Sequence, residues 1–454
     1  MASSNLTSGF IDLATYDEIE KYMYGGADAT TYFVRETRRS TWFTHVPVQL
    51  SKGTGNPSFG GEFSVNISRA GDYLLNCWLR VTLPEVRVGT YSVTDGTDTV
   101  NVNHRVAWVP NVGHNLIQEV TLRFNDLVAA TLNNYVLDFW SEFTVPAGKR
   151  RAYAQMTGMD LGGNFTGSDI AARTLNIPLP LFFTRDTGVA LPTAALPYNE
   201  MRLHLKLATV DRLLMAQEIT TQGGTNAPSG RIIPCPNNYL SSTTTMPQLT
   251  SSNVNVWADY AIVSNEERQK MACAPRDMVI EQFQTNSPNS YTRTGQPSFD
   301  IRFSHAIKAL MFGVSEETMM GTNVPYSNYS TTAHSMTSGA MVTSSQNPLA
   351  SVSLVYENTN RLADMGSDYF THVCPYYNAP CVPDEVGYHL YSYSLDMANL
   401  DPMGSTNYGK LTNVSLQPKP TAGTSSLPAG RLVVVAVNNN VVRVSGGALG
   451  FPVL

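Results

Sequence analysis

The segment Val120-Thr121-Leu122-Arg123-Phe124 alternates apolar and polar side chains, which is the period of a β-strand with one buried face. After a short interval it is followed by Asp138-Phe139-Trp140-Ser141 and then by Pro146. The same order recurs where Val352-Ser353-Leu354-Val355-Tyr356 leads to Asp368-Tyr369-Phe370-Thr371 and then to Pro375. The chain therefore contains two similar β-rich halves. Three copies would supply six similar lobes, which favours a structural building block over a catalytic role.

The length and composition agree with two domains and a polar surface. At 454 residues the chain exceeds the size at which one hydrophobic core stops growing, so we expect two domains of about 200 residues. Charged residues make up only 15% of the chain, against a usual value of about 25%. Such a surface suits extensive contacts between proteins, although an ordinary secreted β-sandwich has the same balance.

The charge and the cysteines exclude several classes of protein. A formal net charge of −6 disfavours neutralisation of nucleic-acid phosphate, so we predict no direct contact with nucleic acid. The basic clusters Arg35 with Arg38-Arg39, and Lys149-Arg150-Arg151, are interpreted as solvated loop charge. Five scattered cysteines do not form a disulfide framework and favour a reducing compartment. No secretory signal and no apolar run long enough to span a membrane is recognised.

Strand patterns dominate the chain and predict an all-β protein. Period-two or nearly continuous runs of β-branched and aromatic residues, bounded by Gly, Pro, Asn and Asp, occur at 62–67, 73–79, 201–207 and 388–395. Because no regular alternation with helices appears, a parallel α/β sheet is disfavoured. We expect antiparallel sandwiches with long loops. Two polar stretches, 222–255 and 321–348, are predicted to be such loops, one in each half.

Capping chemistry predicts two short helices. Thr15 and Glu18 form a Ser/Thr-x-x-Glu box before an amphipathic segment that stops at Gly25-Gly26. Its apolar face carries Tyr16, Ile19, Tyr22 and Met23. Ser264 and Glu267 repeat the box, and Pro275 marks the end of a helix that we expect to join the two halves.

Three candidate chemical sites are disfavoured by their context. Gly404-Ser405-Thr406-Asn407-Tyr408-Gly409-Lys410-Leu411 approaches the phosphate-binding P-loop, but a strand pattern follows it where a helix is required, so we interpret it as a turn. The set His372, Cys374, Cys381 and His389 has no standard zinc spacing. Carboxylate pairs such as Asp138 with Glu142, or Glu266 with Glu267, cannot be placed in a cleft from sequence. We therefore predict no catalytic, cofactor-binding or metal-binding residue.

Several ordered segments carry a resemblance to a known family. Those in the first half include Ser68-Arg69-Ala70-Gly71-Asp72-Tyr73-Leu74, Phe124-Asn125-Asp126 and Leu196-Pro197-Tyr198-Asn199-Glu200. Those in the second half include Asn265-Glu266-Glu267-Arg268, Tyr356-Glu357-Asn358 and Asp401-Pro402-Met403-Gly404-Ser405-Thr406-Asn407-Tyr408-Gly409. Read in order, they resemble the major capsid proteins of iridoviruses and, more broadly, of large nucleocytoplasmic DNA viruses. The signature positions are Gly71, Asp72, Asn125, Pro402, Gly404, Ser405 and Asn407.

The resemblance implies a double jelly roll, which consists of two consecutive eight-stranded antiparallel jelly rolls with short helices in the connections. It divides the chain into an N-terminal arm at 1–27, a first jelly roll at 28–264, a connecting helix at 265–280 and a second jelly roll at 281–454. The implied function is that of a homotrimeric, pseudo-hexameric capsomer that tiles an icosahedral shell.

The resemblance also implies the partners and the location of the protein. The expected partners are other copies of the chain, minor capsid and penton proteins and, at the arm, an inner viral membrane. The expected location is the virion capsid, with assembly in the host cytoplasm. The alternative function is that of a carbohydrate-binding or glycoside-hydrolysing β-sandwich, and a stable trimer in solution would distinguish the capsid protein from both.

Overall fold

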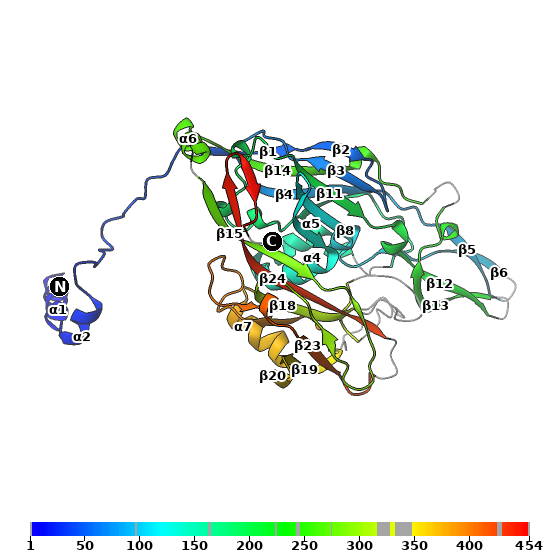
Figure 1. Cartoon of the computed structure of the whole chain (residues 1–454). Helices are drawn as coiled ribbons and strands as arrows, with labels where there is room; N and C mark the ends of the chain where they lie inside the picture. Colours follow the sequence, from blue (N-terminus) through cyan, green and yellow to red (C-terminus); the bar gives the residue numbers. More distant parts are fainter. Residues whose placement is uncertain are drawn as a thin grey trace. The chain divides into compact units, whose positions relative to one another are not determined.

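A computed structural model of the protein describes residues 2–95, 98–161, 165–222, 225–241, 246–273, 275–315, 327–331, 347–424 and 429–452 (Figure 1). The chain divides into two compact units, Met1–Trp42 and Phe43–Leu454. The larger unit contains the β-sheets, and the smaller one contains two helices.

The first half of the larger unit contains two facing antiparallel sheets. Sheet 1A pairs, in spatial order, β1 (Phe43–Gln49), β14 (Val254–Val263), β4 (Tyr73–Leu83) and β10 (Arg173–Pro178). Sheet 1B pairs β2 (Ser51–Gly55), β3 (Glu62–Asn66), β11 (Met201–Leu207), β8 (Ile117–Phe124) and β9 (Leu127–Asn133). Alternate residues of β11 are buried, as its Leu203 and Leu205 show, because one face of the strand points into the sandwich.

The second half repeats this arrangement. Sheet 2A pairs β15 (Arg276–Thr285), β24 (Gly430–Ser445), β18 (Ala306–Ser315) and β21 (His389–Ser392). The short strands β16 (Asn289–Tyr291), β22 (Thr406–Asn407) and β25 (Ala448–Gly450) pair at its edges. Sheet 2B pairs β17 (Phe299–Asp300), β23 (Val414–Pro420), β19 (Leu349–Tyr356) and β20 (Thr359–Gly366).

Both halves have the strand order of a jelly roll. If β2, the short edge strands and all strands outside these four sheets are set aside, and the remaining eight strands of each half are numbered along the chain, the two sheets of each half pair in the orders 1-8-3-6 and 2-7-4-5. The predicted all-β double jelly roll with short connecting helices is therefore confirmed.

The sequence repeat corresponds to a repeated structural motif. In the first half the hairpin β8–β9 leads into α4 (Asn134–Thr144), which connects the fifth strand to the sixth together with α5 (Ala147–Thr157). In the second half the hairpin β19–β20 leads into a π-helical turn, η9 (Tyr369–Val373), and α7 (Cys374–Asn378). The similar segments thus occupy equivalent places in the two jelly rolls.

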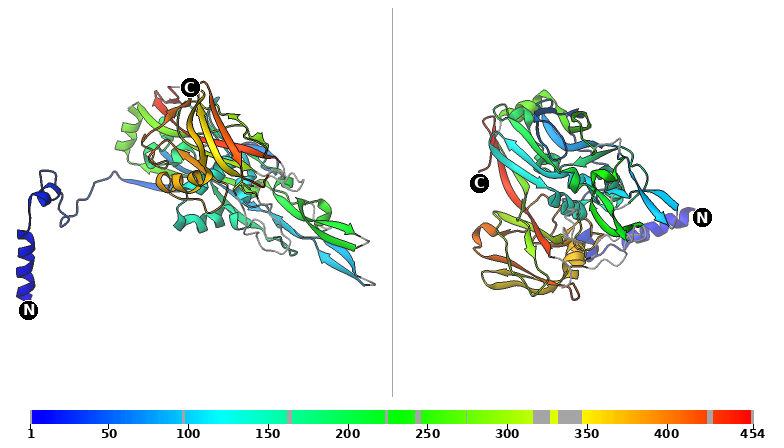
Figure 2. Two further views of the ribbon diagram at one scale, coloured as in Figure 1. Left: turned by 90° about the horizontal axis from the view of Figure 1, so that it is seen from below. Right: turned by 90° about the vertical axis from the view of Figure 1, so that its right-hand side faces the viewer.

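The first polar stretch, 222–255, is not the exposed loop that the composition predicts. Its beginning forms β13 (Thr225–Pro234), which pairs with β12 (Leu214–Gln222), and β12 in turn pairs with β7 (Val106–Trp108). This hairpin lies beside the hairpin of β5 (Thr90–Asp95) and β6 (Asp98–Asn103), where the Asn226 side chain donates a hydrogen bond to the Ser92 carbonyl (Figures 1 and 2). Pairing with β12 therefore makes the beginning of this segment a strand, although its polar composition predicts a loop. Most of the second stretch, 321–348, lies outside the described residues.

The predicted N-terminal helix exists, but its cap differs from the prediction. The N-cap of α2 (Glu18–Met23) is Asp17, and its capping box pairs Asp17 with Glu20. The Thr15 hydroxyl instead donates a hydrogen bond to the Asp12 carbonyl at the end of an unpredicted helix, α1 (Ala2–Ala14). An aspartate caps a helix at least as well as a threonine, so the start moves by two residues.

A helix, α6 (Asn265–Cys273), links β14 to β15; it covers the first part of the predicted segment 265–280, whose last residues belong to β15. In the described part of the chain, no helix combines the length and apolar character that crossing a bilayer requires.

Candidate assembly interface

The two jelly rolls are joined by an apolar contact that shares one core with the first jelly roll. The face of sheet 2A that points away from the second jelly roll's own interior carries Val433, Val435 and Val437, which are all buried. α4 lies against this face, and its Trp140 ring packs edge-on against the ring of Phe283 of β15, with 5.0 Å between the ring centroids. Phe139 of α4 packs edge-on against Tyr388 at 5.4 Å. Because these residues belong to the same cluster as the first sandwich's interior, the halves form one folding unit.

A buried ionic group lies in the same junction. The Glu281 carboxylate of β15 accepts hydrogen bonds from Lys308 Nζ, 2.5 Å from Oε1, and from Arg185 Nε, 2.7 Å from Oε2. The side chains of Glu281 and Lys308 are at most 1% exposed. Arg185 comes from the first jelly roll and also stacks 4.3 Å from the centre of the Trp140 ring. Lys308 is the extra residue of a β-bulge in β18, which directs its side chain into the junction.

The ionic group was not predicted from the sequence. Lys308 stands alone in an apolar strand, which hints at a buried partner, but its partner Glu281 lies 27 positions away along the chain, and Arg185, which also pairs with Glu281, lies 96 positions from that carboxylate. Lys308 also donates to the Asn399 carbonyl, and Arg185 donates to the Ala398 carbonyl at 3.2 Å. The group thereby fixes the loop that leads to the Pro402–Asn407 segment.

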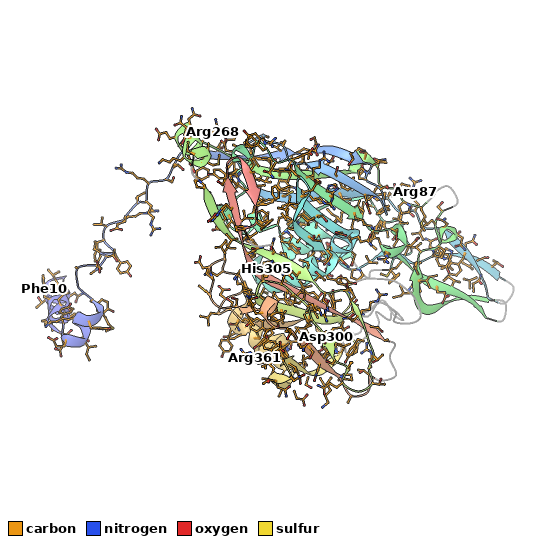
Figure 3. All side chains as sticks on the ribbon, viewed as in Figure 1. Phe10, Arg87, Arg268, Asp300, His305 and Arg361 are labelled. Atoms are coloured by element: carbon orange, nitrogen blue, oxygen red, sulfur yellow. The ribbon has the colours of Figure 1, made fainter. Side chains whose placement is uncertain are left out.

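The signature residues lie in three separate turns. Asp72, which is buried, accepts hydrogen bonds from Arg268 of α6 at 2.8 and 2.9 Å and from the Val263 amide at 2.9 Å. The Arg268 hydrogen bonds, supported by the Val263 amide, lower the pKa of Asp72 against the effect of burial. Asp72 thus ties the start of β4 to the connecting helix, on which Arg268 is labelled in Figure 3. Beside it, a Cβ on Gly71 would approach the Tyr260 Cβ to 2.6 Å.

The other signature residues shape turns at the surface. Asn125 adopts a left-handed conformation (φ 53°) in the β8–β9 turn, and its side chain accepts from the Glu200 amide at 2.7 Å. Gly404 has φ +122°, and a Cβ there would lie 2.6 Å from a backbone oxygen. Asn407 accepts from the Gly409 amide at 3.0 Å, whereas Pro402 and Ser405 are exposed. The P-loop-like segment is therefore a turn that ends in a three-residue 3-10 helix, η10 (Tyr408–Lys410).

The candidate carboxylate pair on α4 is not arranged for catalysis. Asp138 is 1% exposed, lies 2.6 Å from His114 Nδ1 and accepts a hydrogen bond from Ser327. Glu142 is 3% exposed and pairs with Arg150. Burial raises the pKa of Glu142 to about 7, although Arg150 opposes the shift. Neither carboxylate lines the apolar pocket beside α4, so the pair fits a role in packing rather than in hydrolysis.

The candidate zinc ligands have other surroundings. His389 is fully buried, and burial lowers its pKa to about 4; its Nε2 lies 3.0 Å from the Asn347 amide nitrogen. Cys374 is buried and accepts a weak hydrogen bond from Asn378. Within the described residues no three histidine, cysteine or acidic side chains lie close enough together to hold a metal ion.

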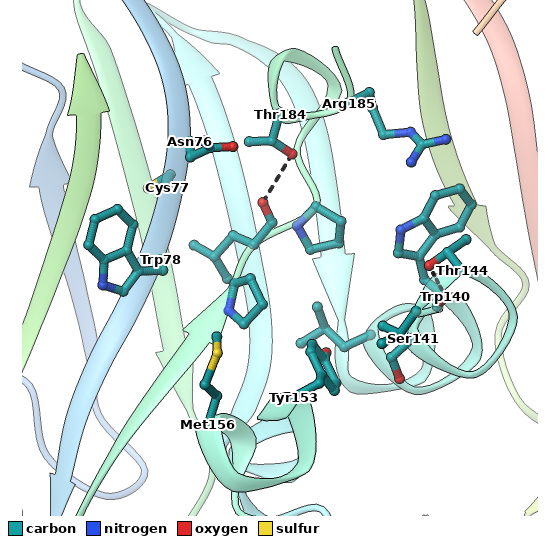
Figure 4. A pocket seen from close by; sticks show the side chains of 15 residues that line it. Asn76, Cys77, Trp78, Trp140, Ser141, Thr144, Tyr153, Met156, Thr184 and Arg185 are labelled. Carbon is teal, nitrogen blue, oxygen red and sulfur yellow. Dashed lines mark hydrogen bonds between the residues drawn. The ribbon is translucent and has the colours of Figure 1, made fainter. Parts of the chain in front are cut away.

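The apolar pocket lies at one edge of sheet 1A, between β4, β10 and the helices α4 and α5 (Figure 4). Its volume is about 360 Å³, and Trp78, Trp140, Tyr153 and Met156 are among its lining residues. On the sheet itself, Trp78 stacks with Trp257 of β14 at 6.4 Å and 15°. The outer face of sheet 1A therefore presents an aromatic pair beside a depression.

The arm residues singled out in the sequence are solvent-exposed. Tyr16, Ile19, Tyr22 and Met23 are 47%, 72%, 92% and 62% exposed. Phe10 of α1, labelled in Figure 3, is 65% exposed. The unit Met1–Trp42 therefore leaves these apolar side chains unburied.

Comparisons with known proteins cover both halves of the chain. A family model described as the major capsid protein N-terminus matches residues 31–263, and one described as large eukaryotic DNA virus major capsid protein matches residues 267–450. The major capsid protein of Costelytra zealandica iridescent virus is 50% identical over 483 residues, which cover 100% of both chains. That of Wiseana iridescent virus is 52% identical over 474 residues, which cover 98% of this chain and 93% of the relative.

Solved structures have the same fold at low sequence identity. The Faustovirus major capsid protein matches with a TM-score of 0.73 at 12% identity, covering 94% of each chain. The PBCV-1 VP54 structure, fitted into a reconstruction of the virophage Sputnik, matches with a TM-score of 0.70 at 21% identity, covering 93% of this chain and all of the other. At these identities the likeness concerns the fold alone.

Proposed function

Because the chain belongs to the family of large eukaryotic DNA virus major capsid proteins, we propose that three copies associate into a pseudo-hexameric capsomer, and that these capsomers tile an icosahedral shell. As a member of that family, the protein is a major capsid protein of the virion and not an enzyme.

The observation that carries this proposal is the identical strand order of the two jelly rolls. Two similar lobes in one chain allow a ring of three chains to have a nearly hexagonal outline, and hexagonal units pack without gaps on flat facets. Contacts within the trimer then belong to the obligate class of about 2,000–5,000 Å², while contacts between capsomers stay weaker because many of them add along the shell.

The mass of the purified full-length protein tests the proposal. Light scattering coupled to size exclusion should give three times the 49.6 kDa of the chain, and electron micrographs should show hexagonal particles. A monomer or dimer at concentrations that support shell formation would contradict the proposed trimer.

We also propose that the N-terminal arm lies at the inner face of the shell, against minor capsid or penton proteins or the inner viral membrane. The exposed apolar residues on α1 and α2 support this placement, because such a surface is stable only when a partner covers it. Deletion of residues 1–25 should leave trimers intact but impair shell formation. As a matched variant, Ile19→Ser/Tyr22→Ser/Met23→Ser keeps the arm but removes its apolar face. Normal shells from both proteins would refute the placement.

We propose three further properties of the chain. The division into an arm (1–27), two jelly rolls (28–264 and 281–454) and a connecting segment (265–280), which contains α6 and the start of β15, should appear as protease-sensitive boundaries in limited proteolysis. The signature turns are proposed to be structural, with no direct contact to nucleic acid. Assembly in the host cytoplasm is supported by cysteines that are all free, and immunogold labelling of infected cells tests it.

A further inference from the structure

The two jelly rolls use different surfaces in the contact between them. The first jelly roll contributes the connection between its fifth and sixth strands, which is α4, together with the edge strand β9. Gln282 of β15 donates a hydrogen bond to the Ala129 carbonyl of β9 at 2.8 Å, and Asn133 donates to the Thr285 hydroxyl at 3.3 Å. The second jelly roll contributes the outer face of sheet 2A. One lobe therefore uses its helical flank, and the other uses its sheet face.

The equivalent surfaces that remain are not covered by any of the described residues. The counterpart of α4 in the second jelly roll is η9 with α7, where Tyr376 and Tyr377 are 72% and 74% exposed. By contrast, eight residues of α4 are buried. The counterpart of β9 is β20, in which no residue is buried. The second jelly roll thus has a free helical flank.

The first jelly roll has a free sheet face. The counterpart of β15 is β1, and none of the residues Phe43–Gln49 is buried, whereas β15 has three buried residues. The outer face of sheet 1A is the equivalent of the valine-rich face of sheet 2A. It carries the Trp78–Trp257 pair, and it adjoins the pocket shown in Figure 4. Aromatic anchors within a polar surround are typical of contacts between separately folded subunits.

We infer that α7 of one copy docks, through Tyr376 and Tyr377, on the outer face of sheet 1A of the next copy around Trp78. The contact repeats between copies the packing that α4 makes on sheet 2A within the chain. It is heterologous, since each copy offers a helical flank to one neighbour and a sheet face to the other. The inference rests on the proposed trimer, because three such contacts alternate with three internal ones around a ring of six lobes.

The difference between the two faces supports this assignment. The valines of sheet 2A are covered as the chain folds, so they never have to be soluble on their own. The face of sheet 1A places its tryptophans beside the exposed Asn76 and the His45–Asp259 pair. A newly folded copy can expose this mixed surface in water until a neighbour arrives.

The test uses full-length protein with one variant on each side of the contact. Tyr376→Ser/Tyr377→Ser removes the aromatic flank, and Asn76→Arg places a long cation on the sheet face. All three positions are exposed, so circular dichroism should show that both proteins fold. Each variant should raise the concentration at which trimers dissociate about tenfold or more, as loss of interface anchors does. Val100→Ser, on the exposed hairpin strand β6, is the control and should remain trimeric.

Mixing the two variants tests the direction of the contact. Because each retains one intact surface, one intact contact should form and give dimers of twice 49.6 kDa, but not trimers. Failure of the mixture to form dimers, or loss of trimers on only one side, overturns the pairing. If both variants remain trimeric like the wild type, the inference falls while the trimer stands. If the wild type itself is monomeric, the proposed function falls.

Discussion

Neutralising Glu281 should weaken the junction between the jelly rolls more than any exposed charge change. In Glu281→Gln the carboxylate that faces both Lys308 and Arg185 is lost, while the steric fit is kept. The Lys308 side chain is 1% exposed, and the Asn399 carbonyl to which it also donates carries no charge that could replace the carboxylate. Removal of one member of a buried ion pair costs about 3–5 kcal/mol, because the remaining charge is left uncompensated. We therefore expect Glu281→Gln to lose about 3–5 kcal/mol of unfolding free energy.

Two further variants, Lys308→Met and the double variant with Glu281→Gln, test how the loss of unfolding free energy is shared within the ionic group. Lys308→Met should cost less than Glu281→Gln, because Glu281 keeps its bond to Arg185, whose side chain is 15% exposed. In the double variant no lysine charge is left buried, so the loss should fall short of the sum of the single losses by about 1–3 kcal/mol.

Urea unfolding at fixed protein concentration, followed by tryptophan fluorescence, measures these differences because Trp140 lies in the junction. Asp277→Asn, at a half-exposed pair with Arg443, is the matched control and should change little. Additive losses within about 0.5 kcal/mol, or a loss below about 1 kcal/mol for Glu281→Gln, would refute the reasoning.

Three further changes have defined outcomes. The folded-state pKa of Glu142, about 7, lies above its usual 4.5, so the stability that its protonated form contributes is present below about pH 4.5 and is lost as the pH rises through 7. The loss of unfolding free energy is about 3 kcal/mol. Denaturation at pH 5 and at pH 8 should show this loss in the wild type and no such loss in Glu142→Gln. The pKa of Asp72 is lowered, so its stabilisation is present above its usual 3.8 and is lost as the pH falls through the lowered value; Asp72→Asn should increase hydrogen exchange in α6 at pH 7, and unchanged exchange would contradict the anchoring role. Gly404→Ala should lower the unfolding free energy by more than about 1 kcal/mol, because Gly404 has a φ of +122° and a Cβ there would meet a backbone oxygen. Gly446→Ala, at φ +61° with open space around it, is the control and should lower the unfolding free energy less. Equal melting temperatures of the two variants would argue against strain at Gly404.

The sequence was informative where a pattern is local and repeated. Alternation around Val120 and Val352 predicted equivalent strands, and the matching residues that follow each of them occupy equivalent places, although the sequence did not predict that they form helices. The helix after Ser264 was also predictable, because a capping box and a proline marked both of its ends. The cap at Thr15 was wrong, since Asp17 offers a competing side chain two residues later and local rules do not rank the two.

What depends on distant residues was not predictable. The Trp78–Trp257 pair and the ionic group around Glu281 are formed by residues from strands far apart in the chain, so no spacing rule applies to them. The polar stretch after Gln222 was misread because its order comes from pairing with β12 rather than from apolar periodicity. Surfaces that are free in one half and covered in the other became visible only when the two halves were compared in space.

The valine-rich face of sheet 2A bears on the fate of incomplete chains. Ribosomes release the first jelly roll before Val433, Val435 and Val437 have been synthesised, so a prematurely terminated product leaves α4 and its aromatic rings without their cover. Such a fragment exposes apolar surface that the complete chain buries, and surface of this kind promotes aggregation. Only the full-length chain can cover α4.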